Sequence, residues 1–296
     1  MSKRIIYYYQ TFSTLRPILD HPTCCGVTHI HLSAFHFGTN KDGSPYIHMN
    51  NYPPEDKQFV DVWKEIEEAH NKGIKIVLML GGAGGAFEVL FSNYIVYSIL
   101  LLQTFRNYPC IGGIDLDIEE EVQLDDVKKL IRLIRNEMGD SFIISMAPVQ
   151  SSLESDEPGM GGFSYKDLYN SEEGKEINYF NGQFYYDYSE ETYDKCITNG
   201  YPANKVVMGM IYSEDLSNAL HTMLCCNNKY NNFGGAFCWE YIHAPPQGNH
   251  DPSQWALLVD SIFHPKHGSY KTMWYNWFST VLYYLMPWKW KWNIYA

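Results

Sequence analysis

Three acidic residues alternate with aliphatic ones in the segment Ile111-Gly112-Gly113-Ile114-Asp115-Leu116-Asp117-Ile118-Glu119-Glu120. Side chains alternate between the two faces of a β-strand, so this pattern places Asp115, Asp117 and Glu119 on one face, with neighbours about 6.5–7 Å apart. Carboxylates this close cannot all stay charged in a desolvated interior, because burial and like-charge repulsion raise the pKa of at least one. A proton retained on Glu119, the outermost of the three, would suit a general acid.

The same acids have two other interpretations. They could face water on a solvated edge strand, but such acids usually stand opposite basic residues across the sheet, and this segment is predicted to be a central strand. They could also hold a divalent cation. The chain contains no CxxC or HExxH motif, and its eleven histidines are scattered. The sequence therefore predicts neither a metal site nor a cofactor.

Short apolar segments that alternate with helical patterns must position these acids. The expected strands are Arg4 to Tyr9, Val27 to Phe35, Lys75 to Leu80, Gly113 to Ile118, Phe142 to Ala147, Tyr179 to Tyr185, Val206 to Met210 and Gly234 to Trp239. The expected helices are Phe59 to Gly73, Phe87 to Asn107, Val127 to Met138, Glu190 to Thr198, Leu216 to Lys229 and Ser253 to Phe263. Eight strands alternating with helices over about 260 residues predict an α/β fold, a (β/α)₈ TIM barrel that forms a single domain. A doubly wound open sheet is the competing layout, but it usually carries a glycine-rich turn after its first strand, and YYYQTF has no glycine.

We expect residues 1–263 to form the barrel and residues 264–296 to form an aromatic C-terminal tail of unknown role. The tail holds five of the eight tryptophans and has no charged residue from Thr272 to Trp288. Trp and Lys alternate from Trp288 to Trp292, a pattern that suits a membrane interface or a sugar-stacking surface. Polar residues and a proline interrupt the apolar run, so a transmembrane anchor is not expected. Membrane association through the tail and packing of the tail against the barrel are both left open.

The composition restricts the partners. The 296 residues include 22 basic and 34 acidic ones, which gives a formal net charge of −12. A surface this acidic repels phosphate backbones, so no nucleic-acid partner is expected. The opening MSKRIIYYYQ lacks the pattern of a signal peptide, so we expect a cytoplasmic protein or non-classical export. The seven irregularly spaced cysteines are predicted to be free thiols, and the chain is predicted to be a monomer.

The acidic segment resembles the DxxDxDxE signature of glycoside hydrolase family 18, the family of chitinases and endo-β-N-acetylglucosaminidases. Asp115, Asp117 and Glu119 match its last three acidic positions, whereas Gly112 occupies the first. Five further segments resemble family motifs in the same order: VTHIHLSAF, Met79-Leu80-Gly81-Gly82 (an SxGG motif with Met in place of Ser), FIISMAPV, Asn181-Gly182-Gln183-Phe184-Tyr185 and Phe233-Gly234-Gly235-Ala236-Phe237-Cys238-Trp239-Glu240-Tyr241.

The resemblance implies a retaining mechanism in which the 2-acetamido carbonyl of the substrate attacks the anomeric carbon. Glu119 would protonate the leaving oxygen and later activate water. Asp117 would hydrogen-bond the acetamide N–H and stabilise the oxazolinium cation, and Asp115 would share a proton with Asp117. Tyr185 would donate a hydrogen bond to the acetamido oxygen and align it for attack.

The candidate substrate-binding residues are Gln183, Trp239, Met146 and Tyr8. By resemblance, Gln183 would face the sugar beside Tyr185, Trp239 would form the floor of the cleft, and Met146 would lie near the site. Trp239 could instead be ordinary barrel filling, and Gln183 and Tyr185 could simply hydrogen-bond each other. The residue after Tyr185 is often Asn in the family and is Tyr186 here, which leaves the contacts to the leaving group open.

Three functions compete at this stage. The first is a chitinase-like hydrolase that cleaves β-1,4 bonds of GlcNAc-containing oligo- or polysaccharides. The second is an endo-β-N-acetylglucosaminidase that acts on N-glycans. The third is a non-catalytic chitinase-like lectin or inhibitor, for which the substitutions at Gly112, Met79 and Tyr186 speak. Glu119 is retained, and we therefore expect an enzyme.

Overall fold

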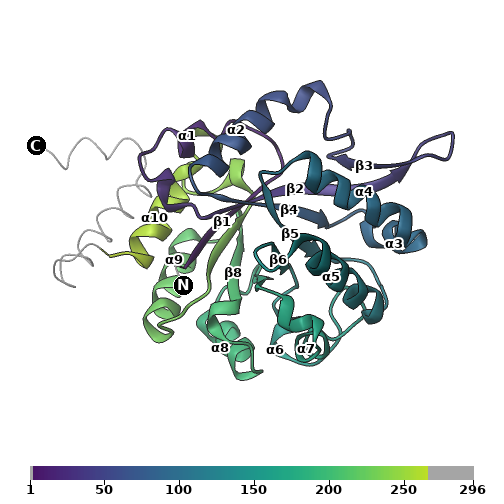
Figure 1. Ribbon diagram of the computed structural model, residues 1–296. Coiled ribbons are helices and arrows are strands. Elements are labelled where there is room, and N and C mark those ends of the chain that lie inside the picture. Colours follow the sequence, from purple (N-terminus) through teal and green to yellow (C-terminus); the bar gives the residue numbers. More distant parts are fainter. Residues whose placement is uncertain (1–2, 266–296) are drawn as a thin grey trace, which may run out of the picture.

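The computed structural model describes residues 3–265, in which eight parallel strands close into a barrel (Figure 1). The barrel strands are β1 (Arg4–Tyr9), β2 (His29–Thr39), β4 (Lys75–Gly81), β5 (Ile111–Asp117), β6 (Ile143–Met146), β7 (Tyr179–Gln183), β8 (Val206–Ile211) and β9 (Gly235–Trp239). Their order is β1-β9-β8-β7-β6-β5-β4-β2, and direct pairing of β1 with β2, Tyr8 opposite His31, closes the ring. The predicted TIM barrel is confirmed.

Helices follow the strands and cover the outside of the barrel (Figure 1). They are α1 (Arg16–Leu19), α2 (Val60–Asn71), α3 (Ala86–Ser92), α4 (Tyr94–Asn107), α5 (Leu124–Met138), α6 (Ser151–Glu154), α7 (Tyr165–Asn170), α8 (Glu190–Thr198), α9 (Leu216–Lys229) and α10 (Ser253–Phe263). The amphipathic pattern decides which face of α5 turns inward, because Val127, Leu130, Ile131 and Ile134 recur at helical spacing and are fully buried. Gly139, with φ of 78°, ends the helix.

The single helix predicted from Phe87 to Asn107 is divided into α3 and α4. The break falls at Asn93, whose backbone is not helical (φ −143°, ψ 69°). Asn is a weak helix former because its side chain competes for backbone hydrogen bonds. Within residues 3–265 no single helix is long and apolar enough to span a membrane. The pair α3 and α4 meets that requirement only when counted together, and the two helices are bent by 119°.

A β-hairpin that the sequence did not predict extends from the barrel. Strand β2 continues to Thr39 and pairs antiparallel with β3 (Pro45–Met49), as Figure 1 shows. The connecting turn is closed by the Asn40 N–H, which donates to the Ser44 carbonyl over 2.8 Å. The Asp42 carboxylate accepts from the Ser44 N–H over 2.9 Å, a side-chain turn that polar residues commonly form.

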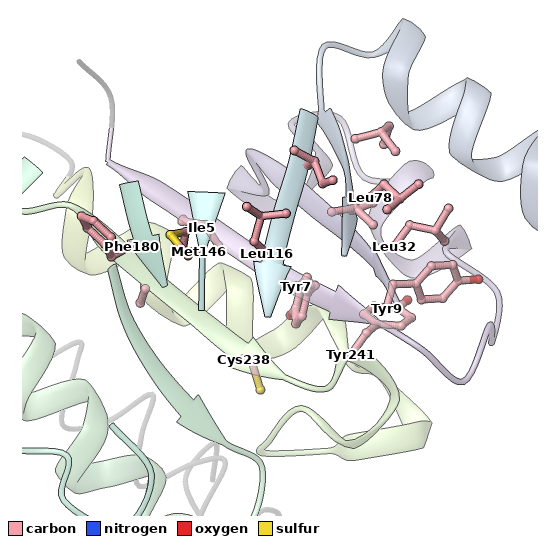
Figure 2. Packing of buried hydrophobic residues seen from close by; sticks show 14 of the residues in the cluster. Ile5, Tyr7, Tyr9, Leu32, Leu78, Leu116, Met146, Phe180, Cys238 and Tyr241 are labelled. Atoms are coloured by element: carbon pink, nitrogen blue, oxygen red, sulfur yellow. The ribbon is translucent and has the colours of Figure 1, made fainter. Parts of the chain in front are cut away.

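The barrel strands separate two apolar layers. An outer layer between sheet and helices includes Ile5, Tyr7, Leu116, Met146 and Phe180 (Figure 2). An inner layer fills the barrel and consists of Ile6, Tyr8, Ala34, Met79, Tyr179, Val207 and Phe237. The inner packing is tight, because a Cβ added at Gly209 would lie 1.8 Å from the Phe237 ring. The alternation in β5 places Leu116 outward and Asp115 inward, as its sequence predicts.

Two sequence-based expectations concern other parts of the chain. The predicted aromatic tail begins at residue 264, and its residues 266–296 lie outside the described residues. All seven cysteines are described, and all of them are free thiols, as predicted. Six of the seven are buried, and Cys225 is half-buried.

Candidate active site

The three acids Asp115, Asp117 and Glu119 lie towards the carboxyl end of the barrel, where TIM-barrel enzymes carry their active sites. Asp115 and Asp117 are on β5 and are buried, with 0% and 5% of their surfaces exposed. Glu119 lies two residues beyond the end of the strand and is half-buried. The row of three acids therefore extends from the barrel interior towards solvent, and Glu119 is the most accessible of the three.

Asp115 is surrounded by polar groups from four different strands. Its carboxylate accepts hydrogen bonds from the Tyr8 hydroxyl (2.7 Å), the Ser145 hydroxyl (2.6 Å) and the Asn181 amide (3.1 Å). The Nδ1 atom of His31 lies 3.2 Å from Oδ2 of Asp115. Burial opposes ionisation, but His31 and the hydroxyl donors outweigh it, and the pKa of Asp115 is lowered. Asp115 therefore remains charged at the base of the site.

The pKa of Asp117 is shifted in the opposite direction. Burial raises its pKa well above the usual range, and the nearby carboxyl groups of Glu119, Asp115 and Glu120 raise it further. Its Oδ1 atom accepts a hydrogen bond from the Gln183 amide over 3.2 Å. The pKa values of the two neighbouring carboxyl groups are thus shifted in opposite directions, which favours the charged form of Asp115 and the protonated form of Asp117.

The pKa of Glu119 is shifted in the direction that a general acid requires. Burial raises its pKa, the nearby Gln183 amide acts against this, and the Glu120 carboxyl raises the pKa again. A carboxyl group with a raised pKa keeps its proton closer to neutral pH, which is the state needed to protonate a leaving oxygen.

The influence of Glu120 gives a prediction about pH dependence. Glu120→Gln removes a like charge next to Glu119, so ionisation of Glu119 becomes easier and its pKa falls. The basic limb of the kcat–pH profile reports loss of that proton, and we expect it to move to lower pH. Glutamine keeps an oxygen that can accept from the Phe87 and Glu88 N–H groups, which Glu120 binds at the start of α3. An unchanged profile measured on purified protein would show that Glu120 does not tune the acid.

The glycines of the SxGG-like motif allow β4 to approach Asp117 closely. Gly81 has φ of 100°, and a Cβ there would lie 2.3 Å from the Asp117 carbonyl oxygen. The Gly82 N–H donates to that same carbonyl over 2.8 Å. A backbone atom cannot move aside as a flexible side chain can, so only glycine fits at position 81.

Gly81→Ala should lower the free energy of unfolding by roughly 2–4 kcal/mol, because the left-handed backbone and the clash with Asp117 act together. Gly85→Ala is the matched control, since Gly85 also has a left-handed backbone (φ 74°, ψ 37°) but has no atom near the added Cβ. Urea denaturation should show a smaller loss, roughly 1 kcal/mol, in the control. Equal losses in the two variants would contradict the proposed contact with Asp117.

Aromatic side chains complete the site on the side of β7 to β9. Tyr185 lies two residues beyond β7, and burial and the nearby Asp117 carboxyl raise the pKa of its hydroxyl, which stays a hydrogen-bond donor. Trp239 ends β9 and is half-buried, with its ring 5.4 Å from that of Tyr8. Gln183 donates to Asp117 and to the Ala147 carbonyl, so its amide is engaged with the site and not with Tyr185.

The structure corrects two of the expected substrate contacts. Met146 is fully buried and packs in the outer layer with Leu116 and Phe180, so it has no access to a ligand (Figure 2). Its neighbour Ser145 takes the inward position and binds Asp115. Tyr8 does point into the barrel, but it is only 2% exposed and acts on Asp115 from below.

Residues that sequence analysis missed are the supports of Asp115. These are His31, Ser145 and Asn181, all inward-facing and fully buried. The signal was present for His31, because a polar residue alternates with apolar ones in the strand segment HIHLSAF. No group of three or more His, Cys, Asp or Glu side chains within residues 3–265 is arranged to hold a metal ion.

The described residues form a closed (β/α)₈ barrel with a row of carboxyl groups and the Trp239 ring at its carboxyl end, an arrangement that a glycoside hydrolase could use. Comparison with solved structures shows similarity to members of glycoside hydrolase family 18. The chain is 29% identical to a fungal endo-β-N-acetylglucosaminidase from glycosyl hydrolase family 18, with 89% of this chain and 99% of that one covered and a TM-score of 0.78. It is 28% identical to the chitinase ChiC from Aspergillus fumigatus, with 88% and 100% covered and a TM-score of 0.76.

More distant structures share only the fold. A xylanase and α-amylase inhibitor protein, XAIP-III, is 16% identical over 88% of this chain and 99% of its own, with a TM-score of 0.61. No protein-family model and no curated protein matched the chain. The resemblance to glycoside hydrolase family 18 is confirmed by the structural comparison, and the chain is a chitinase-like glycoside hydrolase.

Proposed function

We propose that the protein cleaves β-1,4 bonds of GlcNAc-containing glycans with retention of configuration, by substrate-assisted catalysis within residues 1–263. The observation that carries this proposal is the placement of Asp115, Asp117 and Glu119 along and just beyond the carboxyl end of β5, with the Gln183 amide bound to Asp117. The raised pKa of Asp117 favours its protonated form, which is a poor nucleophile. This supports attack by the substrate's own acetamido oxygen.

The chemistry follows from the order of the groups. Glu119 donates its proton to the leaving oxygen as the acetamido carbonyl attacks the anomeric carbon, and it later removes a proton from the incoming water. Asp117 holds the acetamide N–H, and as positive charge develops on the oxazolinium ring it can give up its proton towards Asp115. Tyr185 donates to the acetamido oxygen and fixes its position. Trp239 supplies an apolar surface beneath the pyranose ring.

An endo-β-N-acetylglucosaminidase acting on N-glycans is the second candidate. Its support is the 29% sequence identity to a fungal enzyme of that name. The identity to the Aspergillus chitinase is 28%, so sequence identity does not favour one activity over the other. Both activities require an N-acetyl group next to the cleaved bond, so the same carboxyl groups serve either one. A lectin-like protein is disfavoured, because Glu119 is in place with a raised pKa.

A substrate panel distinguishes these functions. The purified protein is incubated with chitohexaose and, separately, with a glycoprotein that carries high-mannose N-glycans. Products with β-anomeric ends from chitohexaose, seen by NMR before mutarotation, support the retaining chitinase. Release of an intact glycan from the glycoprotein alone supports the second candidate. Binding of chitohexaose without turnover across a broad pH range would overturn the proposed hydrolysis.

A further inference from the structure

Two tyrosine side chains are exposed at the same end of the barrel as Glu119. Tyr186 follows β7 and is 79% exposed, and Tyr212 follows β8 and is 45% exposed. Tyr212 comes directly after β8 and Tyr186 lies three residues after β7, and the carboxyl ends of such strands surround the active site in TIM barrels. Large apolar rings left open to water at such a place commonly mark a binding surface.

The backbone presents Tyr186 to solvent in a constrained way. Its φ of 62° lies in the left-handed region, which bulky residues avoid and Asn tolerates. The Tyr186 N–H donates to Glu214 over 2.9 Å, and its hydroxyl lies 3.4 Å from the Ser213 hydroxyl. The N–H and the hydroxyl of Tyr186 therefore both lie next to the loop that follows β8.

Contacts connect this surface to the site. The Tyr212 N–H donates over 2.9 Å to the carbonyl of Trp239, the residue expected to lie beneath the sugar. The Tyr212 ring packs on His243 with centroids 4.9 Å apart, and the hydroxyl of Ser213, the neighbour of Tyr212, lies 3.4 Å from that of Tyr186. The loop after β8 therefore connects Tyr186 to the strand end that carries Trp239.

We propose that Tyr186 and Tyr212 form a platform on which sugar units stack on the leaving-group side of the cleaved bond; this rests on the proposed function. Glu119 must reach the leaving oxygen, and the Gln183 amide lies beside Glu119 at the end of β7. The chain continues from there to Tyr186, so a glycan that extends past Glu119 meets this loop next. The apolar face of a GlcNAc ring matches an exposed tyrosine ring.

The test compares Tyr186→Asn and Tyr186→Phe on two substrates. Asn suits the left-handed backbone, so the first variant removes the ring without adding strain, whereas Phe keeps the ring and loses only the hydroxyl. With chitohexaose, Tyr186→Asn should lower kcat/KM about tenfold and shift the product lengths, and Tyr186→Phe should retain the activity of the native protein. With chitobiose oxazoline, which has no leaving sugar, all three proteins should hydrolyse at equal rates. Ile95→Ala, 72% exposed on α4, controls for loss of a surface side chain.

Unchanged chitohexaose kinetics in Tyr186→Asn, or equal losses of activity on both substrates, would overturn the platform. If the native protein turns over neither chitohexaose nor chitobiose oxazoline, the proposed function is rejected instead. The platform is then judged by calorimetric binding of chitohexaose to Glu119→Gln protein with and without Tyr186→Asn: about tenfold weaker binding supports it, and equal affinity overturns it.

Discussion

Glu119→Gln should lower kcat for chitooligosaccharide hydrolysis by about 10²–10⁴-fold, the usual contribution of a positioned general acid. Glutamine has the shape of glutamate but carries no proton that can be transferred to the leaving oxygen. The carboxyl group of Glu119 is half-buried beyond β5, and burial raises its pKa, so the native side chain is prepared for that transfer. Substrate affinity should be largely kept, because Trp239 and Gln183, the residues proposed to contact the sugar, are unchanged. Chromatography of the released oligosaccharides gives the rate of hydrolysis, and calorimetry gives the affinity for the substrate.

Glu121→Gln is the matched control for this prediction. Glu121 lies two residues further along the same loop and is exposed. The substitution makes the same chemical change at an exposed position of the same loop, and hydrolysis should continue at the native rate. Full activity of Glu119→Gln would remove Glu119 from the mechanism, whereas loss of binding in that variant would assign it a role in holding substrate.

Asp115→Asn should lower the free energy of unfolding by about 3–5 kcal/mol, the usual effect of removing one partner from a buried network that contains a charge. Its carboxylate is fully buried and accepts from Tyr8, Ser145 and Asn181. An asparagine offers one acceptor oxygen in place of two, so at least one buried donor loses its partner. Loss of the negative charge also makes ionisation of Asp117 easier and lowers its raised pKa.

The pH dependence distinguishes this effect from a loss of packing. The folded-state pKa of Asp115 is lowered, so its contribution is present above the unfolded pKa and is lost as pH falls through the folded pKa. The stability difference between the native protein and Asp115→Asn should therefore be full at neutral pH and narrow in acid. Asp125→Asn, with a side chain 96% exposed on α5, should stay within about 0.5 kcal/mol of the native protein throughout. A pH-independent difference for Asp115→Asn would point to packing alone.

Much of the barrel could be predicted from the sequence, because each strand is a short apolar segment bounded by polar turns. β1, α8, α9 and α10 match the predicted ranges at both ends. The hairpin strand β3 escaped prediction because its half-buried residues show no clear alternation. The break between α3 and α4 escaped because the whole segment from Phe87 to Asn107 is rich in apolar residues, and one Asn interrupts it.

The site was predictable where alternation is visible and not elsewhere. In β5 acids alternate with aliphatic residues, so their inward face follows directly. The segment FIISMAPV is apolar on both faces, and the sequence cannot tell whether Ser145 or Met146 turns inward; the pairing of β6 with β5 decides it. The supports of Asp115 come from strands far apart in the chain, and only the closed register brings Tyr8, His31 and Asn181 together.

The way Asp115 is supported links assembly of the barrel to its electrostatics. Tyr8 and His31 belong to the first two strands, Ser145 and Asn181 to β6 and β7, and Tyr8 is 107 residues from the carboxylate it binds. A half-barrel made from either end of the chain holds only some of these donors, and it would bury a charge without adequate compensation. Partly assembled barrels are penalised for that reason, and we therefore expect both halves of the barrel to unfold together.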